Sequence, residues 1–221
     1  MSTYQTAKAQ PSPKGFDINQ VISADQAQWF YQKGYRFCLR YLSRQKVQQA
    51  HDLQTQEVQD ILNAGLALMA VQHVEQAGWE PYGALGQEYG TNAANHAQAL
   101  GLSKGINIWL DLEGINPTFH HNMQAIVDYC QAWYTAVNNA GYSPGLYVGY
   151  NNFLDSATLY KRLSFQHYWR SNSNVEGVDH RGYQVVQRLA SKVNINGNIL
   201  KIDENYAQYD YKGDSVIWMT A

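Results

Sequence analysis

The chain carries few charges, and they nearly balance. Asp, Glu, Lys and Arg make up 15% of the 221 residues, and the formal net charge is −2. Proteins that bind nucleic acid or an anionic membrane by long-range attraction carry a clear positive excess, so we expect neither kind of partner. The longest apolar runs are only as long as a strand. A membrane span needs about 20 apolar residues, so we expect no membrane insertion.

Cysteine is scarce, and metal-binding patterns are missing. Cys38 falls in a predicted strand and Cys130 in a predicted helix, without C-x-x-C spacing. This pattern favours two buried thiols over a metal or redox pair, and it leaves a single disulfide between them open. The seven histidines show no zinc spacing. We therefore expect no metal site and no cofactor.

The first fourteen residues differ in composition from the rest. Residues 1–14 are polar, include Pro11 and Pro13, and lack the apolar core of a secretory signal. We expect a flexible N-terminal tail and no Sec signal peptide. Residues 15–221 contain no linker, internal repeat or low-complexity block. Their length suits one barrel, so we predict a single domain over 15–221.

Strand and helix patterns alternate through the first two thirds of this domain. Ser23 and Gln26 form a capping box before the first helix. Residues 78–90, rich in glycine and aromatics, predict a loop that covers a site, and Thr91 is expected to cap the helix after it. Strands are predicted at 15–18, 36–42, 66–71, 106–113 and 145–150, and the helices after them end near Gly34, Gly65, Gly101 and Gly141.

The last third is rich in strands. Residues 165–170, 183–189 and 199–203 have strand patterns without full helices between them. Eight strands with this rhythm predict an α/β fold, an irregular TIM-like (β/α) barrel with helices missing after the later strands. A doubly wound open sheet is the alternative. The apolar segment VIWM near the C-terminus is expected to pack against the barrel.

Two carboxylates end the fourth predicted strand. In Asn107-Ile108-Trp109-Leu110-Asp111-Leu112-Glu113-Gly114, the acids Asp111 and Glu113 are two positions apart, so both side chains point to the same side. At about 3.3 Å per residue they are spaced roughly 6.6 Å along the strand. At that spacing each carboxylate alters the proton affinity of the other.

Other polar side chains follow the remaining strands, where functional groups gather in such barrels. Four carboxylates exceed the nearby cations, so at least one should have a raised pKa. A protonated carboxyl beside an ionised one is what glycosidic-bond cleavage needs, although oxygen ligands also suit magnesium or calcium. The strand-end residues are Asp17, Arg40 with Tyr41, Gln72 with His73, Asp111 with Glu113, Tyr147, Trp169, Gln187 and Asp203.

These motifs resemble a known group in their order and spacing. Gly15-Phe16-Asp17, Asp111-x-Glu113, Gly145-Leu146-Tyr147, Gln187 and Ile202-Asp203 look like motifs of glycoside hydrolase family 25 lysozymes. More closely, the chain resembles their relatives in a glycoside-hydrolase-like domain formerly of unknown function, from about residue 14 to 206. The resemblance implies a cofactor-free peptidoglycan hydrolase. Such a muramidase cleaves the β-1,4 bond between N-acetylmuramic acid and N-acetylglucosamine.

The resemblance also implies roles for the acids. Glu113 would be the general acid, and Asp111 its ionised partner. Asp17 and Asp203 would complete an acidic floor that orients this pair or holds the acetamido group. We expect Glu113 to be the less solvated acid of the pair and to hold the proton. The expected substrate-binding residues are Arg40, Tyr41, Gln72, His73, Tyr147, Trp169 and Gln187, with Tyr147 and Trp169 serving either as sugar platforms or as barrel packing.

One position departs from the family pattern. Family 25 lysozymes usually have an acid at the end of the second strand, where this chain has Arg40-Tyr41. The arginine would bind a carboxylate of the muramic acid or its peptide, or neutralise Asp17. The alternative function is therefore a catalytically degenerate barrel that binds cell-wall glycan without hydrolysing it.

The substrate implied by the resemblance lies outside the cytoplasm. Without a Sec signal, we expect a protein made in the cytoplasm and delivered to the cell wall by a non-Sec route. A secreted antibacterial effector or a phage lysis enzyme fits this expectation. An effector would have a secretion apparatus and a cognate immunity protein as partners.

Overall fold

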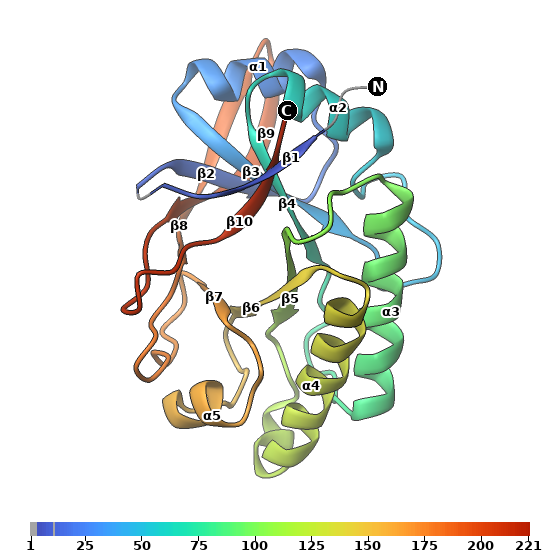
Figure 1. Ribbon diagram of the computed structural model, residues 1–221, viewed down its shortest axis with the longest axis vertical. Helices are drawn as coiled ribbons and strands as arrows, with labels where there is room; N and C mark the ends of the chain where they lie inside the picture. The colour runs from blue at the N-terminus through green and yellow to red at the C-terminus, as the bar shows by residue number, and fades with distance from the viewer. Residues whose placement is uncertain (1–3, 11) are drawn as a thin grey trace.

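The computed structural model describes residues 4–10 and 12–221 (Figure 1). The expectations for residues 1–3 and 11 lie outside this part. The helices are α1 (Ala24–Gln32), α2 (Thr55–Asn63), α3 (Gly83–Ala99), the 3-10 helix η1 (Pro117–His121), α4 (Met123–Asn139) and α5 (Ser156–Lys161). The strands are β1 (Gln5–Lys8), β2 (Lys14–Ile18), β3 (Tyr35–Leu42), β4 (Ala67–Gln72), β5 (Asn107–Leu112), β6 (Ser143–Val148), β7 (His167–Arg170), β8 (Val185–Ile195), β9 (Asn198–Ala207) and β10 (Ile217–Thr220).

Eight of these strands close into a barrel. Their order is β4-β3-β2-β9-β8-β7-β6-β5, and β5 pairs back to β4. All neighbours from β2 through β8 in chain order are parallel, whereas β9 is antiparallel to both β2 and β8. Closure confirms the TIM-like barrel and excludes the open doubly wound sheet.

The reversed direction of β9 corrects one expectation. We expected Asp203 at the carboxyl end of an eighth parallel strand, but it lies within an antiparallel strand opposite Asp17. The cause is the turn Asn196-Gly197, where both residues have positive φ, 52° and 87°. Ile195 and Asn198 pair directly across this turn. A two-residue connection of this kind joins only antiparallel strands.

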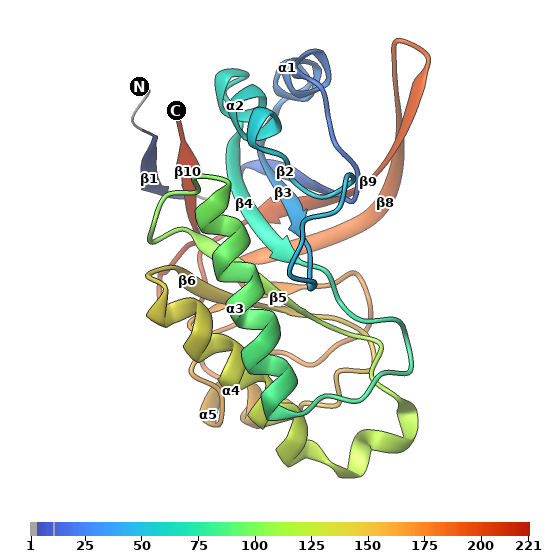
Figure 2. The ribbon, with the colours of Figure 1, turned by 90° about the vertical axis from the view of Figure 1, so that its right-hand side faces the viewer.

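Helices cover only part of the barrel. Figures 1 and 2 show α1 beside α2, and α3 alongside α4, on the outside of the strands. Between β7 and β9 the described residues contain no helix, which confirms that helices are missing after the later strands. Instead, Ile195, Leu200 and Ile202 of the β8–β9 hairpin join Phe16 and Phe30 in the main hydrophobic core.

Helix α3 begins earlier than expected. Residues 83–90 were predicted to be loop, and Thr91 to be a cap, but both belong to α3. The glycines that suggested a loop have a packing role. A Cβ at Gly86 would overlap the carbonyl oxygen of Tyr129 on α4, and one at Gly90 would lie 2.7 Å from the carbonyl oxygen of Trp133. Glycine at these positions lets the two helix backbones approach closely.

Strands β1 and β10 extend the sheet, so the expectation of a loose N-terminal tail is wrong for residues 5–8. Strand β1 pairs with β10 from Gln5 opposite Thr220 to Lys8 opposite Ile217, and β10 in turn pairs with β4 through Met219 and Leu68. The residues of β1, Gln-Thr-Ala-Lys, are polar or small and give no strand pattern in the sequence. They form a strand because their backbone pairs with β10. The buried Val216, Trp218 and Met219 confirm that the VIWM segment packs against the barrel.

None of the helices in the described ranges combines the length and the apolar character that crossing a bilayer requires.

Candidate functional site

The barrel interior is apolar near the amino ends of the strands and polar near their carboxyl ends. A second buried cluster, distinct from the main core, includes Phe37, Met69, Trp109 and Trp169. Trp109 fits because Gly145 is its partner on β6, and a Cβ there would overlap the indole ring. Strand side chains alternate between faces, so Asp111 points to the same side of β5 as Trp109, nearer the carboxyl end.

Asp17 on β2 has the most hydrogen bonds of the four acids. It is 2% exposed and accepts from the Tyr41 hydroxyl at 3.2 Å, from Gln187 Nε2 at 3.1 Å and from Asn205 Nδ2 at 2.7 Å. Burial and the nearby Asp203 raise the pKa of Asp17 to about 7, although its three donors favour the ionised form.

Asp111 is the acid most clearly held in the protonated form. It is 7% exposed, and its Oδ1 is buried without a hydrogen-bond partner among the described residues. Burial, then Glu113 and Asp17, raise the pKa of Asp111 well above its usual value. An ionised carboxylate without donors is costly in such a place, so the proton stays on Asp111.

Glu113 lies farther out and is half-buried. Burial and the charge of Asp203 raise the pKa of Glu113 to about 7. Gly149 is packed against it, because a Cβ at this glycine would overlap Glu113 Cβ and lie 2.6 Å from Oε2. We expected Glu113 to be the less solvated acid and Asp111 the ionised one. This expectation is wrong, because strand β5 ends at Leu112 and Glu113 already lies beyond the closed barrel.

The four acids therefore form an inner pair, Asp17 and Asp111, and an outer pair, Glu113 and Asp203. Asp203 is half-buried on β9, and burial raises its pKa. We expected Asp17 and Asp203 to be the two acids at the bottom of the site, and this expectation is corrected. The two most buried acids are Asp17 and Asp111, whereas Asp203 is more exposed. The one described group of three His, Cys, Asp or Glu side chains that converge closely enough for a metal ion does not include these acids.

Three further predicted residues point into the barrel. The Tyr147 hydroxyl donates to Gln187 Oε1 at 2.9 Å, and Gln187 donates in turn to Asp17. Trp169 is 1% exposed and donates from Nε1 to Asn205 Oδ1 at 2.9 Å. Its indole is therefore interior packing, which is the second of the two roles considered for it.

Asn205 is the site residue that the sequence interpretation missed. It is 0% exposed and links Trp169 to Asp17. A signal was present, because Asn205 stands two positions after Asp203 and so shares its face of β9.

Two predicted binding residues lie away from the acids. Arg40 points outward from β3, is 0% exposed, and pairs with Glu57 of α2, with Nε to Oε1 at 2.6 Å. Gln72 is 1% exposed and accepts from Trp133 Nε1 at 2.7 Å while donating to the carbonyl of Tyr89 at 2.8 Å. Both side chains bind residues of the surrounding helices, so the prediction that they contact the substrate is wrong.

Tyr41 and His73 lie at the edge of the site. Tyr41 is half-buried and donates to Asp17. The His73 ring stacks on that of Tyr41, with 4.5 Å between centroids, and its Nε2 lies 2.9 Å from Asp52 Oδ1. His73 thus reaches the acids only through Tyr41.

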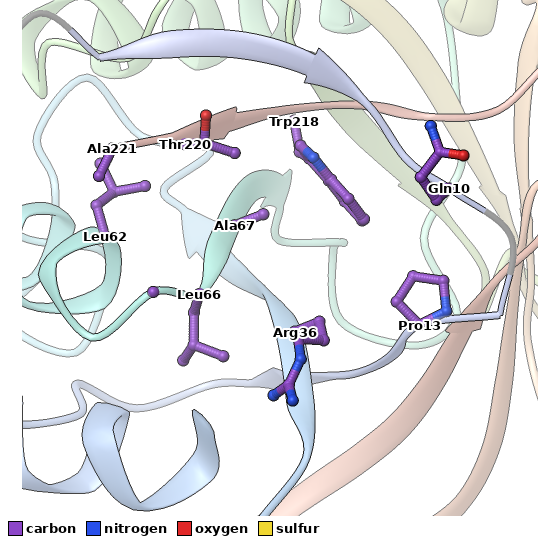
Figure 3. Close-up of a pocket in the computed structure, with 10 residues that line it drawn as sticks. Gln10, Pro13, Arg36, Leu62, Leu66, Ala67, Trp218, Thr220 and Ala221 are labelled. Carbon is purple, nitrogen blue, oxygen red and sulfur yellow. The ribbon is translucent and has the colours of Figure 1, made fainter. Parts of the chain in front are cut away.

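The two cysteines and one apolar pocket lie away from the four acids. Cys38 and Cys130 are buried and free. A pocket of about 440 Å³ lies at the amino end of β4, lined by Arg36, Leu66, Ala67, Trp218 and others (Figure 3). Because the acids lie at the opposite ends of the strands, this pocket is separate from them.

Comparisons with solved structures agree with the barrel. The Tat-secreted protein Rv2525c from Mycobacterium tuberculosis matches with a TM-score of 0.66 and 17% identity, over 92% of this chain and 100% of that one. A family 25 glycosyl hydrolase from Bacillus anthracis matches with a TM-score of 0.58 and 11% identity, over 94% of each chain. A muramidase from Trichobolus zukalii matches with a TM-score of 0.55 and 15% identity, over 88% of this chain and 93% of that one. At identities this low, the structural matches show that the proteins share a fold and nothing more.

No curated protein has a sequence that matches this chain. The family model described as Rv2525c-like, glycoside hydrolase-like domain matches residues 27–207, well over half of the sequence. This match confirms the resemblance on which the motifs were interpreted. The chain therefore belongs to the Rv2525c-like family of glycoside hydrolase-like domains.

Proposed function

We propose that this protein is a peptidoglycan hydrolase of the muramidase type, which cleaves the β-1,4 bond between N-acetylmuramic acid and N-acetylglucosamine. The observation that carries the proposal is Glu113, a half-buried carboxyl whose pKa is raised to about 7 beside a second half-buried acid, Asp203. Part of the Glu113 population keeps its proton at neutral pH. A group with this proton affinity is suited to general acid catalysis.

Glu113 acts as the acid that protonates the leaving glycosidic oxygen. Asp203, whose negative charge contributes to the raised pKa of Glu113, acts as the ionised partner. Its carboxylate stabilises the positive charge that develops at the anomeric carbon, or activates water. This assignment replaces Asp111 by Asp203 as the charged partner, because ionising the deeply buried Asp111 is energetically unfavourable.

The inner pair supports the outer pair. Asp111, buried and protonated, adds no negative charge beside Asp17 and Glu113. Asp17 is held in place by Tyr41, Gln187 and Asn205. Tyr147 supports this arrangement through Gln187. The reaction draws on no cofactor in this proposal.

Purified peptidoglycan provides the direct test. Wild-type protein is incubated with sacculi, and released fragments are identified by mass. Cleavage on the expected bond gives fragments with new N-acetylmuramic acid reducing ends, whereas Glu113→Gln reduces their formation by about 10²–10⁴-fold, the usual contribution of a general acid. Glu204→Gln, which changes the neighbouring surface acid paired with Lys14, is the matched control and should stay active. The absence of new reducing ends at every pH between about 4 and 8 would contradict the proposal.

The second candidate is a barrel that binds cell-wall glycan without cutting it. Tyr41 favours this function, because its hydroxyl is bonded to Asp17 at a position where family 25 lysozymes usually have an acid. Sedimentation with sacculi separates the two. Binding that survives Glu113→Gln, together with no turnover by the wild type, selects the glycan-binding function.

We also propose that the protein acts at the cell wall, as an antibacterial effector or a lysis enzyme. The similar Mycobacterium tuberculosis protein is Tat-secreted, and the CTP1L endolysin shares the fold. Expression in a bacterial host tests the place of action. A version targeted to the periplasm should lyse cells while a cytoplasmic version does not, and equal toxicity of both would argue against the wall as target. An effector would also need an immunity protein and a secretion apparatus.

A further inference from the structure

Two histidines and an aspartate meet beside the barrel mouth. His51 and Asp52 lie in the segment between β3 and α2, and His73 directly follows β4. Asp52 is 0% exposed, His73 is half-buried and His51 is exposed. None of the three belongs to the inner or outer pair of acids, so the proposed glycan chemistry does not use them.

Both imidazoles face a single carboxylate oxygen. His73 Nε2 lies 2.9 Å from Asp52 Oδ1, and His51 Nε2 lies 3.5 Å from the same atom. One ligand atom from each residue lies within 4.8 Å of the other two. Around a tetrahedral zinc ion with bonds of about 2.0–2.1 Å, neighbouring ligand atoms stand roughly 3.4 Å apart. The exposed His51 side chain is free to make the small adjustment that remains.

Contacts behind the three side chains hold them in place. Asp52 Oδ2 accepts from the backbone N–H of Gln49 at 2.7 Å, which leaves Oδ1 toward the histidines. The His73 ring rests on Tyr41, with 4.5 Å between centroids. Arg40 Nη2 donates to the His51 carbonyl at 3.0 Å. Supporting contacts of this kind orient the ligands of metal sites and strengthen metal binding.

A pocket adjoins the cluster on its open side. It has a volume of about 260 Å³, and its lining includes all three residues together with Asn19, Ser43 and Gln49. This volume accommodates water or a small ligand next to the three protein atoms. Two imidazole nitrogens, one carboxylate oxygen and one open position make a donor set that suits zinc.

We propose that His51, Asp52 and His73 form a binding site for a divalent transition metal, with zinc as the preferred ion. We expected no metal site, because the seven histidines show no zinc spacing in the sequence. Folding creates the site by bringing the end of β4 beside the segment after β3. This inference is independent of the proposed function. The His73 ring and the Tyr41 side chain would link a bound ion to Asp17.

Zinc titration of the untagged, chelator-treated full chain tests the site. Isothermal titration with Zn(II), together with elemental analysis after dialysis, should give one ion per chain. His51→Gln should weaken binding by roughly 100-fold or more, beyond the effect of losing an outer-shell contact. The His51 side chain is exposed, and among the described residues it contacts only Asp52 and the neighbouring His73 ring, so this variant should fold. Co(II) should give visible absorption bands in the wild type that His51→Gln and His73→Gln lose.

The chain contains a matched control. His120 and His121 are also neighbouring, exposed histidines, with 3.5 Å between ring centroids, but they are not part of the His51, Asp52 and His73 group. The double variant His120→Gln/His121→Gln should keep the full zinc affinity. The proposal is overturned if His51→Gln binds zinc as tightly as wild type, if the control variant loses the ion, or if wild type binds none.

Discussion

Asp17 and Asp203 occupy opposing positions in the antiparallel pairing of β2 and β9. This pairing brings an outer acid next to an inner one, and the charge of Asp203 contributes to the raised pKa of Asp17. A parallel eighth strand would have carried its acid to a strand end instead. The proton affinities of the site thus depend on the direction of one strand.

Replacing Asp203 should lower the pKa of Asp17. In Asp203→Asn the neighbouring charge is gone, so the pKa of Asp17 should fall below about 7. It should stay above 3.8, because burial is the larger cause. Carboxyl ¹³C titration by NMR measures this value. Glu204→Gln, one residue along and directed at Lys14, should leave the pKa of Asp17 unchanged, and an equal decrease in both variants would refute the coupling.

Glycan cleavage should decline as the pH rises above neutrality. The proposed acid Glu113 must carry its proton, and its pKa is raised to about 7. The value of kcat/KM should therefore fall by about tenfold per pH unit well above that pH. In Asp203→Asn the rate should drop, because the proposed ionised partner is lost. The decline of the residual rate should begin at a lower pH, because the charge that raises the pKa of Glu113 is removed. A wild-type rate that stays constant up to pH 9 would show that Glu113 is not the acid.

Asp111→Asn should stabilise the folded protein at neutral pH. The pKa of Asp111 is raised in the folded state, so its contribution to stability is fully present below its unfolded-state pKa and is lost as pH rises through the folded-state value. Asparagine removes this loss. The free energy of unfolding at pH 8 should therefore rise, and the gain should vanish near pH 3. Urea unfolding at both values measures it, and a loss of stability at pH 8 would contradict the prediction.

Gly149→Ala should impair catalysis through Glu113. The added methyl group would overlap Glu113 Cβ and press on Oε2, so the carboxyl must move. A displacement of about 1 Å can reduce a rate by about 10²-fold. Activity on peptidoglycan is the measurement. Gly177→Ala is the control, because nothing lies within 4 Å of a Cβ at that position. Equal activity in the two variants would show that Gly149 does not position the acid.

Gly86→Ala should destabilise the contact between α3 and α4. Alanine normally favours a helix over glycine by about 1 kcal/mol. Here its methyl group would overlap the Tyr129 carbonyl oxygen, and such overpacking costs about 1–3 kcal/mol. Thermal unfolding should show a lower Tm. Gly83→Ala, where the nearest atom is the Asp128 Cβ at 3.6 Å, should not lower it, and a raised Tm in Gly86→Ala would contradict the packing argument.

The barrel could be predicted because its signals are local. Apolar strand patterns, the Ser23–Gln26 capping box and the alternation of strand and helix all reappear in the structure. One local signal was overlooked and another was misinterpreted. Asn196-Gly197 is the strongest short hairpin signal, and it specifies the antiparallel β9. The glycines of 83–90 indicated a loop by composition, but they lie in α3, where they allow close packing against α4.

The site was only partly predictable, because strand-end position does not determine where a side chain points. Asp17, Asp111, Tyr147 and Gln187 face inward, as their alternation along each strand allows. Arg40 and Gln72 face the helices instead, and that choice depends on the phase of each strand relative to the closed barrel. The relative burial of Asp111 and Glu113 depends on where β5 leaves the barrel. None of these quantities can be obtained from spacing alone.

The ribbon formed by β1 and β10 has a practical consequence for handling the protein. Gln5 faces Thr220, and both strands lie side by side in Figures 1 and 2. Because β10 joins β4 at Leu68, near the amino end of that strand, the ribbon lies at the end of the barrel opposite the four acids. A label attached to either strand of this ribbon would therefore lie at the opposite end of the barrel from the four acids and would not cover them.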